Sequence, residues 1–101
     1  MRKIEIRTKH NLNKEETKNK LLIEVPLLQE KYKNELKNLV IDWQDDTKFT
    51  TEFSVMGMKF KGNGEILEKE LISILELRGA AELFYKRIQN AIEFKLNEIL
   101  N

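Results

Sequence analysis

Residues 2–16, RKIEIRTKHNLNKEE, hold the change of pattern that decides the fold class of this chain. As far as Lys9, apolar or small residues alternate with charged ones, the period of two expected for a strand with one buried face. The alternation then ends, and Asn13 is a suitable N-cap for a helix that begins near Lys14, with two glutamates in its first turn. We therefore predict a strand that leads directly into a helix.

The expected first helix has one apolar stripe, which follows helical spacing and comprises Leu21, Val25, Leu28, Tyr32 and Leu36. Pro26 lies within this stretch. Because proline has no amide hydrogen and its ring clashes with the preceding turn, we expect a kink at Pro26 or two shorter helices that meet there.

The period of two returns at residue 39 and continues, with interruptions, to residue 66. Alternation through 39–43 and 49–55 flanks the polar residues Asp45-Asp46-Thr47, a pattern that predicts a hairpin. Another strand begins after Gly57. Glycines at positions 62 and 64 interrupt its pattern, so we expect a bulge, a bend or a tight turn there.

Residues 70–77, ELISILEL, are apolar on both sides of a predicted strand, with Ile72 and Ile74 on one side and leucines on the other. Such a strand needs a cover on each face, so we expect the helices on one face and a further surface on the other.

The segment from Ala80 to Leu100 has the clearest helical periodicity of the chain. The predicted order is thus strand, helix, four strands, helix. This order is typical of an α+β fold in which the C-terminal helix packs on an antiparallel sheet. A length of 101 residues suits one hydrophobic core, so we expect a single α+β domain over residues 1–101.

Composition limits the classes of function. Eighteen basic and seventeen acidic residues are interspersed and leave a net charge of +1, which does not favour nucleic acid as a partner. The chain has no cysteine, so disulfides and thiol nucleophiles are excluded. The N-terminus shows no signal-peptide pattern and no stretch is long and apolar enough to span a membrane, so we expect a cytoplasmic protein.

Few residues suggest catalysis or metal binding. His10 is the only histidine and has no neighbouring nucleophile motif, so we interpret it as a corner residue between strand and helix rather than a general base. Asp42, Asp45 and Asp46 lack a calcium-loop spacing and are interpreted as hairpin-turn residues. The glycines at 57–64 lack a phosphate-loop ending. We predict no catalytic residue, no metal site and no cofactor.

Two sets of residues are candidates for binding. Trp43, Phe53 and Phe60 are expected in the core, and they are also candidates to line an apolar ligand cavity beneath the last helix. Lys95 lies within the apolar arc of that helix, where it either meets an acidic ligand or extends its charge to the edge.

The second set concerns association. Leu83 and Phe94 fall off the main apolar face of the last helix, and Ile72 and Ile74 form the second apolar side of the strand at 70–77. Exposed, these side chains would form a surface for a partner, a granule or a second copy of the chain.

Five stretches together resemble the polyhydroxyalkanoic acid system proteins, a small bacterial family whose genes are associated with polyester granule metabolism. They are the opening KIEIRTKHNL, the glutamate pair at 15–16, WQDD at 43–46, GMKFKGNG at 57–64 and IEFKLNEIL at 92–100. The resemblance implies a compact α+β fold similar to the helix-grip group, in which a curved antiparallel sheet grips a long C-terminal helix. It implies no established active site.

On this resemblance we expect a non-enzymatic accessory, granule-associated or interaction protein of polyhydroxyalkanoate metabolism. Its expected partners are a polyester granule surface or granule protein and a second copy of the chain, as a homodimer. The alternative is a small helix-grip protein that binds an apolar or acyl ligand between the sheet and the C-terminal helix.

Overall fold

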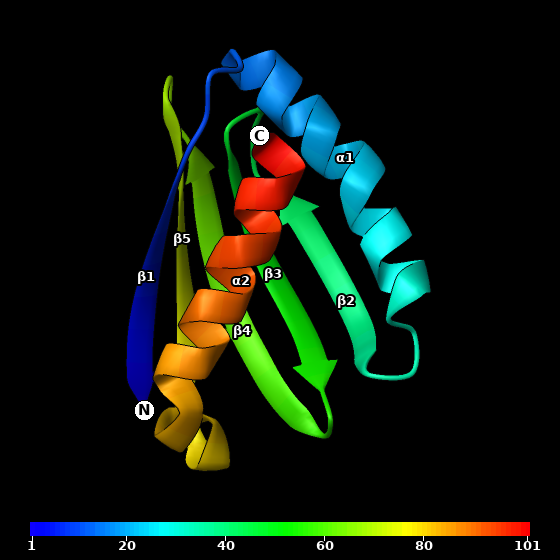
Figure 1. The fold of residues 1–101 in the computed structure, drawn as a ribbon, viewed down its shortest axis with the longest axis vertical. Coiled ribbons are helices and arrows are strands. Elements are labelled where there is room, and N and C mark those ends of the chain that lie inside the picture. Colours follow the sequence, from blue (N-terminus) through cyan, green and yellow to red (C-terminus); the bar gives the residue numbers. More distant parts are fainter.

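The computed structural model describes residues 1–101 and has the predicted order of strand, helix, four strands and helix (Figure 1). The elements are β1 (Arg2–Lys9), α1 (Lys14–Lys31), β2 (Leu36–Trp43), β3 (Lys48–Val55), β4 (Met58–Ile66), β5 (Glu70–Leu77), the 3-10 turn η1 (Gly79–Phe84) and α2 (Tyr85–Leu100). The five strands form one antiparallel sheet in the order β1-β5-β4-β3-β2. The predicted α+β fold class is therefore confirmed.

Both helices lie on one face of the sheet (Figure 1). The C-terminal helix α2 packs on this face, as predicted, and lies mainly against β1, whereas α1 lies beside β2 at the opposite edge. The other face of the sheet carries no helix. The fold thus has two layers, with its core between sheet and helices.

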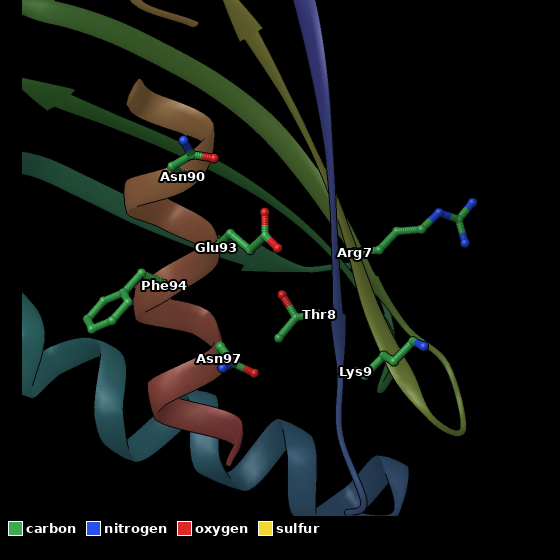
Figure 2. A pocket seen from close by; sticks show the side chains of 7 residues that line it. All are labelled: Arg7, Thr8, Lys9, Asn90, Glu93, Phe94 and Asn97. Carbon is green, nitrogen blue, oxygen red and sulfur yellow. The ribbon is translucent and has the colours of Figure 1, made fainter. Parts of the chain in front are cut away.

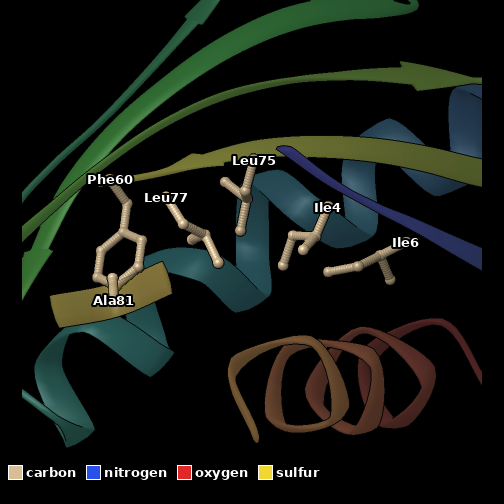
Figure 3. Close-up of a cluster of buried hydrophobic side chains, with 6 residues drawn as sticks. All are labelled: Ile4, Ile6, Phe60, Leu75, Leu77 and Ala81. Atoms are coloured by element: carbon tan, nitrogen blue, oxygen red, sulfur yellow. The ribbon is translucent and has the colours of Figure 1, made fainter. Parts of the chain in front are cut away.

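The alternation read from the first strand creates the core. Ile4 and Ile6 face α2, and Ile4 lies opposite Leu75 in the β1–β5 register. The buried cluster around them, drawn in Figure 3 on the side of the sheet that faces α2, comprises Ile4, Ile6, Phe60, Leu75, Leu77 and Ala81. Burial of each large aliphatic side chain contributes about 1.5–3 kcal/mol. The β1–β5 pair is therefore fixed by side-chain burial as well as by its backbone hydrogen bonds.

A second buried cluster joins both helices to the other end of the sheet. It consists of Leu21, Phe49, Ile66, Leu71 and Leu100. Leu21 belongs to α1 and Leu100 to the last turn of α2, so this cluster holds the two helices together.

The start of α1 agrees with the prediction, and one of the two alternatives for its interior is excluded. The Asn13 side chain accepts a hydrogen bond from the Glu16 amide at 2.8 Å, and the Glu16 carboxylate accepts from the Asn13 amide at 3.3 Å, a complete capping box. Pro26 does not divide the segment into two helices, because α1 is continuous from Lys14 to Lys31. It ends one turn earlier than its apolar stripe suggests, and Leu36 begins β2.

The irregularity predicted in β4 lies instead in β2. The β3–β4 and β4–β5 registers run without a break through Gly62 and Gly64, so the expected bulge or turn at these glycines is wrong. In β2 the register shifts between Lys37 and Val40, where Asn38 has a φ of 57°. The extra residue bends this edge strand.

Two side-chain amides attach α2 to the free edge of β1. Gln89 Nε2 donates to the Glu5 carbonyl at 3.0 Å, and Asn101 Nδ2 donates to the Lys9 carbonyl at 2.9 Å. An edge strand otherwise presents unpaired backbone groups that invite pairing with another chain. These two bonds satisfy part of that edge from within the molecule.

Candidate interaction surfaces

The helix α2 has apolar side chains on two sides. Tyr85, Ile88, Ile92 and Leu96 pack against the core cluster of β1, β4 and β5. Leu83, in the preceding turn, is 82% exposed and Phe94 is 67% exposed. Phe84 is 48% exposed, although its spacing assigns it to the core-facing side. The sequence-predicted interface residues of the C-terminal segment are thus at the surface.

A polar groove of about 570 Å³ separates β1 from α2 and was not anticipated from the sequence. It is lined by Arg7, Thr8, Lys9, Asn90, Glu93, Phe94 and Asn97 (Figure 2). Thr8 points from β1 toward α2, while Phe94 points away from β1 (Figure 2). The Thr8 hydroxyl is buried and has no hydrogen-bond partner. The sequence does contain a signal for this polar side of α2, because Asn90, Glu93 and Asn97 follow helical spacing.

Ile72 and Ile74 are partly buried on the face of the sheet that carries no helix. In register, Ile72 lies opposite Arg7 of β1 and Glu65 of β4. Arg7 forms ion pairs there with Glu70 at 2.9 Å and with Glu5 at 3.2 Å. Charged side chains of the neighbouring strands therefore flank these isoleucines, and the further covering surface predicted for this face is not a second helix layer.

Of the four predicted ligand-binding residues, Phe53 and Phe60 lie together. Their rings stack with centroids 5.1 Å apart, across a directly paired position of β3 and β4. Phe60 is only 3% exposed and belongs to the core cluster beneath α2. The space between sheet and helix at this point is filled by side chains.

Trp43 lies in the other cluster, on the edge strand β2. Its ring is 4.8 Å from the Phe49 ring, and the Lys18 ammonium lies 4.7 Å from its centroid. Trp43 also lines an apolar cleft of about 220 Å³ between α1 and β2, together with Leu21, Leu22, Val25, Pro26, Gln29, Leu39 and Ile41. This cleft does not contain Phe53 or Phe60.

Lys95 lies between the two helices. Its ammonium is 5.3 Å from the Tyr32 ring centroid and 3.8 Å from the Glu98 carboxylate. A hydrogen bond from Lys95, with the charge of Lys31, holds the pKa of the Tyr32 phenol below its usual range. The structure therefore does not gather Trp43, Phe53, Phe60 and Lys95 around one cavity.

His10 occupies the predicted corner between β1 and α1 and is only 3% exposed. Its backbone amide donates to the Lys69 carbonyl at 2.9 Å, and its Nδ1 lies 3.5 Å from the Thr17 hydroxyl oxygen. That hydroxyl donates to the Asn13 carbonyl at 2.9 Å, so it can only accept from His10. His10 Nδ1 is therefore the protonated nitrogen, and Nε2 is buried without a partner.

Asp45 organises the turn between β2 and β3, which confirms the predicted hairpin. One carboxylate oxygen accepts from the Thr47 amide at 2.7 Å, from the Thr47 hydroxyl at 3.0 Å and from the Lys48 amide at 2.9 Å. These bonds hold the pKa of Asp45 below its usual range, and the two from Thr47 have the largest effect. Asp46 instead pairs with Lys18 at 3.1 Å.

Neither α1 nor α2 is long and apolar enough to cross a lipid bilayer. No protein-family model matches the chain, and no curated protein matches it. Among solved structures, the crystal structure of TTHA0849 from Thermus thermophilus is similar, with 13% sequence identity and a TM-score of 0.48. The similarity covers 98% of this chain and 92% of that one. The function of the chain is therefore inferred from its own surfaces.

Proposed function

We propose that this chain is a non-enzymatic accessory protein of polyhydroxyalkanoate metabolism that binds the surface of polyester granules through the solvent side of its C-terminal segment. The exposure of Leu83 and Phe94, at 82% and 67%, is the observation that carries the proposal. The resemblance of five sequence stretches to the polyhydroxyalkanoic acid system family is the reason for proposing a polyester granule as the surface that is bound.

Exposed apolar side chains on a helix whose other side is packed are available to an apolar surface. Transfer of each large apolar side chain out of water is worth up to about 1.5–3 kcal/mol. Lys86 and Arg87 stand in the same segment, are exposed and form no ion pair within the chain. Apolar side chains with adjoining basic ones suit a surface that is apolar and carries negative charge.

The test is co-sedimentation of the purified protein with particles of poly(3-hydroxybutyrate) coated with anionic phospholipid. We expect binding, and we expect the double variant Leu83→Ser/Phe94→Ser to lose most of it. Met56→Ser is the matched control, because Met56 is 80% exposed in the turn between β3 and β4. Equal loss in the control variant, or no binding by the unmodified protein, would refute the proposal.

A second candidate function is the binding of an apolar or acyl ligand, with its place changed. The observation that favours it is the apolar cleft between α1 and β2, rather than the filled space beneath α2. Trp43 is the only tryptophan and lines this cleft, so its fluorescence reports occupancy. A saturable change on titration with a fatty acid, abolished in Val25→Asp and retained in Lys95→Gln, would support this function. The absence of any change would exclude it for that ligand class.

A further inference from the structure

The solvent side of α1 carries an exposed stripe, in which Leu27 also borders the groove between α1 and α2. Lys20, Ile23, Leu27 and Glu30 follow one another at steps of three, four and three residues, and all four are exposed. Ile23 is 62% and Leu27 is 60% exposed. Since successive helical residues turn by roughly 100°, these four lie on the side opposite Val25, which faces the sheet cluster.

The stripe is symmetric about its centre: when the direction of the helix is inverted, each apolar position maps onto an apolar one and the basic position maps onto the acidic one. From its centre at position 25, an apolar residue stands two positions away on each side, Ile23 and Leu27. A charged residue stands five positions away on each side, basic Lys20 toward the N-terminus and acidic Glu30 toward the C-terminus. A helix surface with this symmetry is complementary to itself in the antiparallel direction.

We propose that the chain forms a homodimer in which the outer side of α1 packs antiparallel against the outer side of α1 of a second copy. The two-fold axis is perpendicular to the helix and crosses the interface at the level of residue 25. Ile23 then contacts the partner's Leu27, and Lys20 pairs with the partner's Glu30; each contact occurs twice. Steps of three and four residues are the spacing at which two helices pack side by side.

The charges that would meet across the axis are available. Lys20 forms no ion pair within the chain, and Glu30 has only an exposed contact of 3.7 Å with Lys33. Figure 1 shows α1 at the margin of the molecule, with no other element over its outer side.

This dimer is independent of the proposed granule binding, because it uses α1 and leaves Leu83 and Phe94 exposed. It also differs from the residues that the sequence suggested for association, none of which lies on α1. Failure of one proposal therefore leaves the other standing.

Charge reversal with rescue tests the orientation directly. Sedimentation velocity and native mass spectrometry of the unmodified full chain should show a dimer. Lys20→Glu and Glu30→Lys each turn two attractions per dimer into repulsions, and we expect each to weaken the dimer by on the order of tenfold. The double variant Lys20→Glu/Glu30→Lys restores opposite charges across the axis and should recover most of the affinity.

Two further variants separate this interface from others. Ile23→Ser/Leu27→Ser should abolish the dimer without loss of fold, since both side chains are exposed in the single chain. Leu83→Ser/Phe94→Ser should leave the dimer unchanged. A monomer for the unmodified chain, or a dimer that is insensitive to the α1 changes, would overturn the proposal. Single reversals without rescue in the double variant would overturn the antiparallel arrangement.

Discussion

The ring of Phe49 on β3 lies against Gly64 on β4, in the space that a Cβ atom at position 64 would occupy. The two residues are directly paired in the β3–β4 register, and Phe49 is buried in the cluster that joins both helices. Glycine is needed here because an aromatic ring covers its backbone.

We expect Gly64→Ala to destabilise the protein by about 1–3 kcal/mol, because the added methyl group displaces the Phe49 ring within a packed cluster. Urea denaturation followed by circular dichroism measures the change. Asn63→Ala is the control, since Asn63 is exposed on the other face of the same strand. A change at position 64 no larger than at position 63 would mean that the ring moves aside freely.

Thr17→Val tests the hydrogen bonds at the His10 corner. The valine keeps the volume of the fully buried Thr17 but removes the acceptor of His10 Nδ1 and the donor to the Asn13 carbonyl. We expect a loss of about 1–3 kcal/mol in the free energy of unfolding, measured by urea denaturation. Thr50→Val, at an exposed strand position, should change the stability little. A similar loss of stability there would mean that the threonine-to-valine change, and not the loss of the His10 and Asn13 hydrogen bonds, causes the destabilisation.

The hydrogen bonds of Asp45 contribute stability to the folded chain at neutral pH, and this contribution is lost in acid. Its folded-state pKa is lowered, so the stabilisation is fully present above the ordinary pKa of about 4 and is lost in the acid range below it, as pH falls through the folded value. Asp45→Ala should lower the melting temperature at neutral pH, and the difference from the unmodified chain should narrow across this window. Thermal unfolding at a series of pH values measures it. Asp42→Ala, which removes a carboxyl group outside the turn, serves as control, and an equal pH-dependent effect there would contradict the assignment.

Lys95 is expected to control the ionisation of Tyr32. Lys95→Met removes the hydrogen bond that holds the Tyr32 pKa down, so the phenol should ionise at higher pH in the variant. Ultraviolet titration of the phenol measures this, in a Tyr85→Phe background that leaves Tyr32 as the only tyrosine. Lys33→Met provides a control at an exposed lysine near Tyr32 in sequence. If the titration is unchanged by Lys95→Met, the two side chains do not interact in solution.

The sequence was sufficient for the elements whose pattern is local. Alternation around Ile4 and Ile6 predicted β1, and the residues after it predicted the capping box at Asn13. The end of α1 was misplaced because Leu36 continues the helical spacing by coincidence, while its actual neighbour is Val55 of β3. Helical spacing cannot distinguish a last turn from a chain that has already reversed.

The binding residues depended on information that one sequence does not contain. Phe60 and Trp43 are both aromatic strand residues, but the strand order puts Phe60 beneath α2 and Trp43 on an edge strand beside α1. Leu83 and Phe94 were recognised because a helix has a calculable outer side. The stripe on α1 could not be predicted from the sequence because apolar residues occur all round this helix, and only the packed structure shows which of them remain exposed.

The topology places β1 beside elements far from it in sequence, since β1 pairs with β5 alone and α2 holds the β1 edge through Gln89 and Asn101. During synthesis β1 leaves the ribosome before the other four strands, and it cannot pair until β5, the last of them, has been synthesised. Pairings so distant in sequence slow folding. A nascent chain halted before β5 exposes Ile4 and Ile6 with no strand to receive them, which makes translation through β5 a condition for a complete sheet.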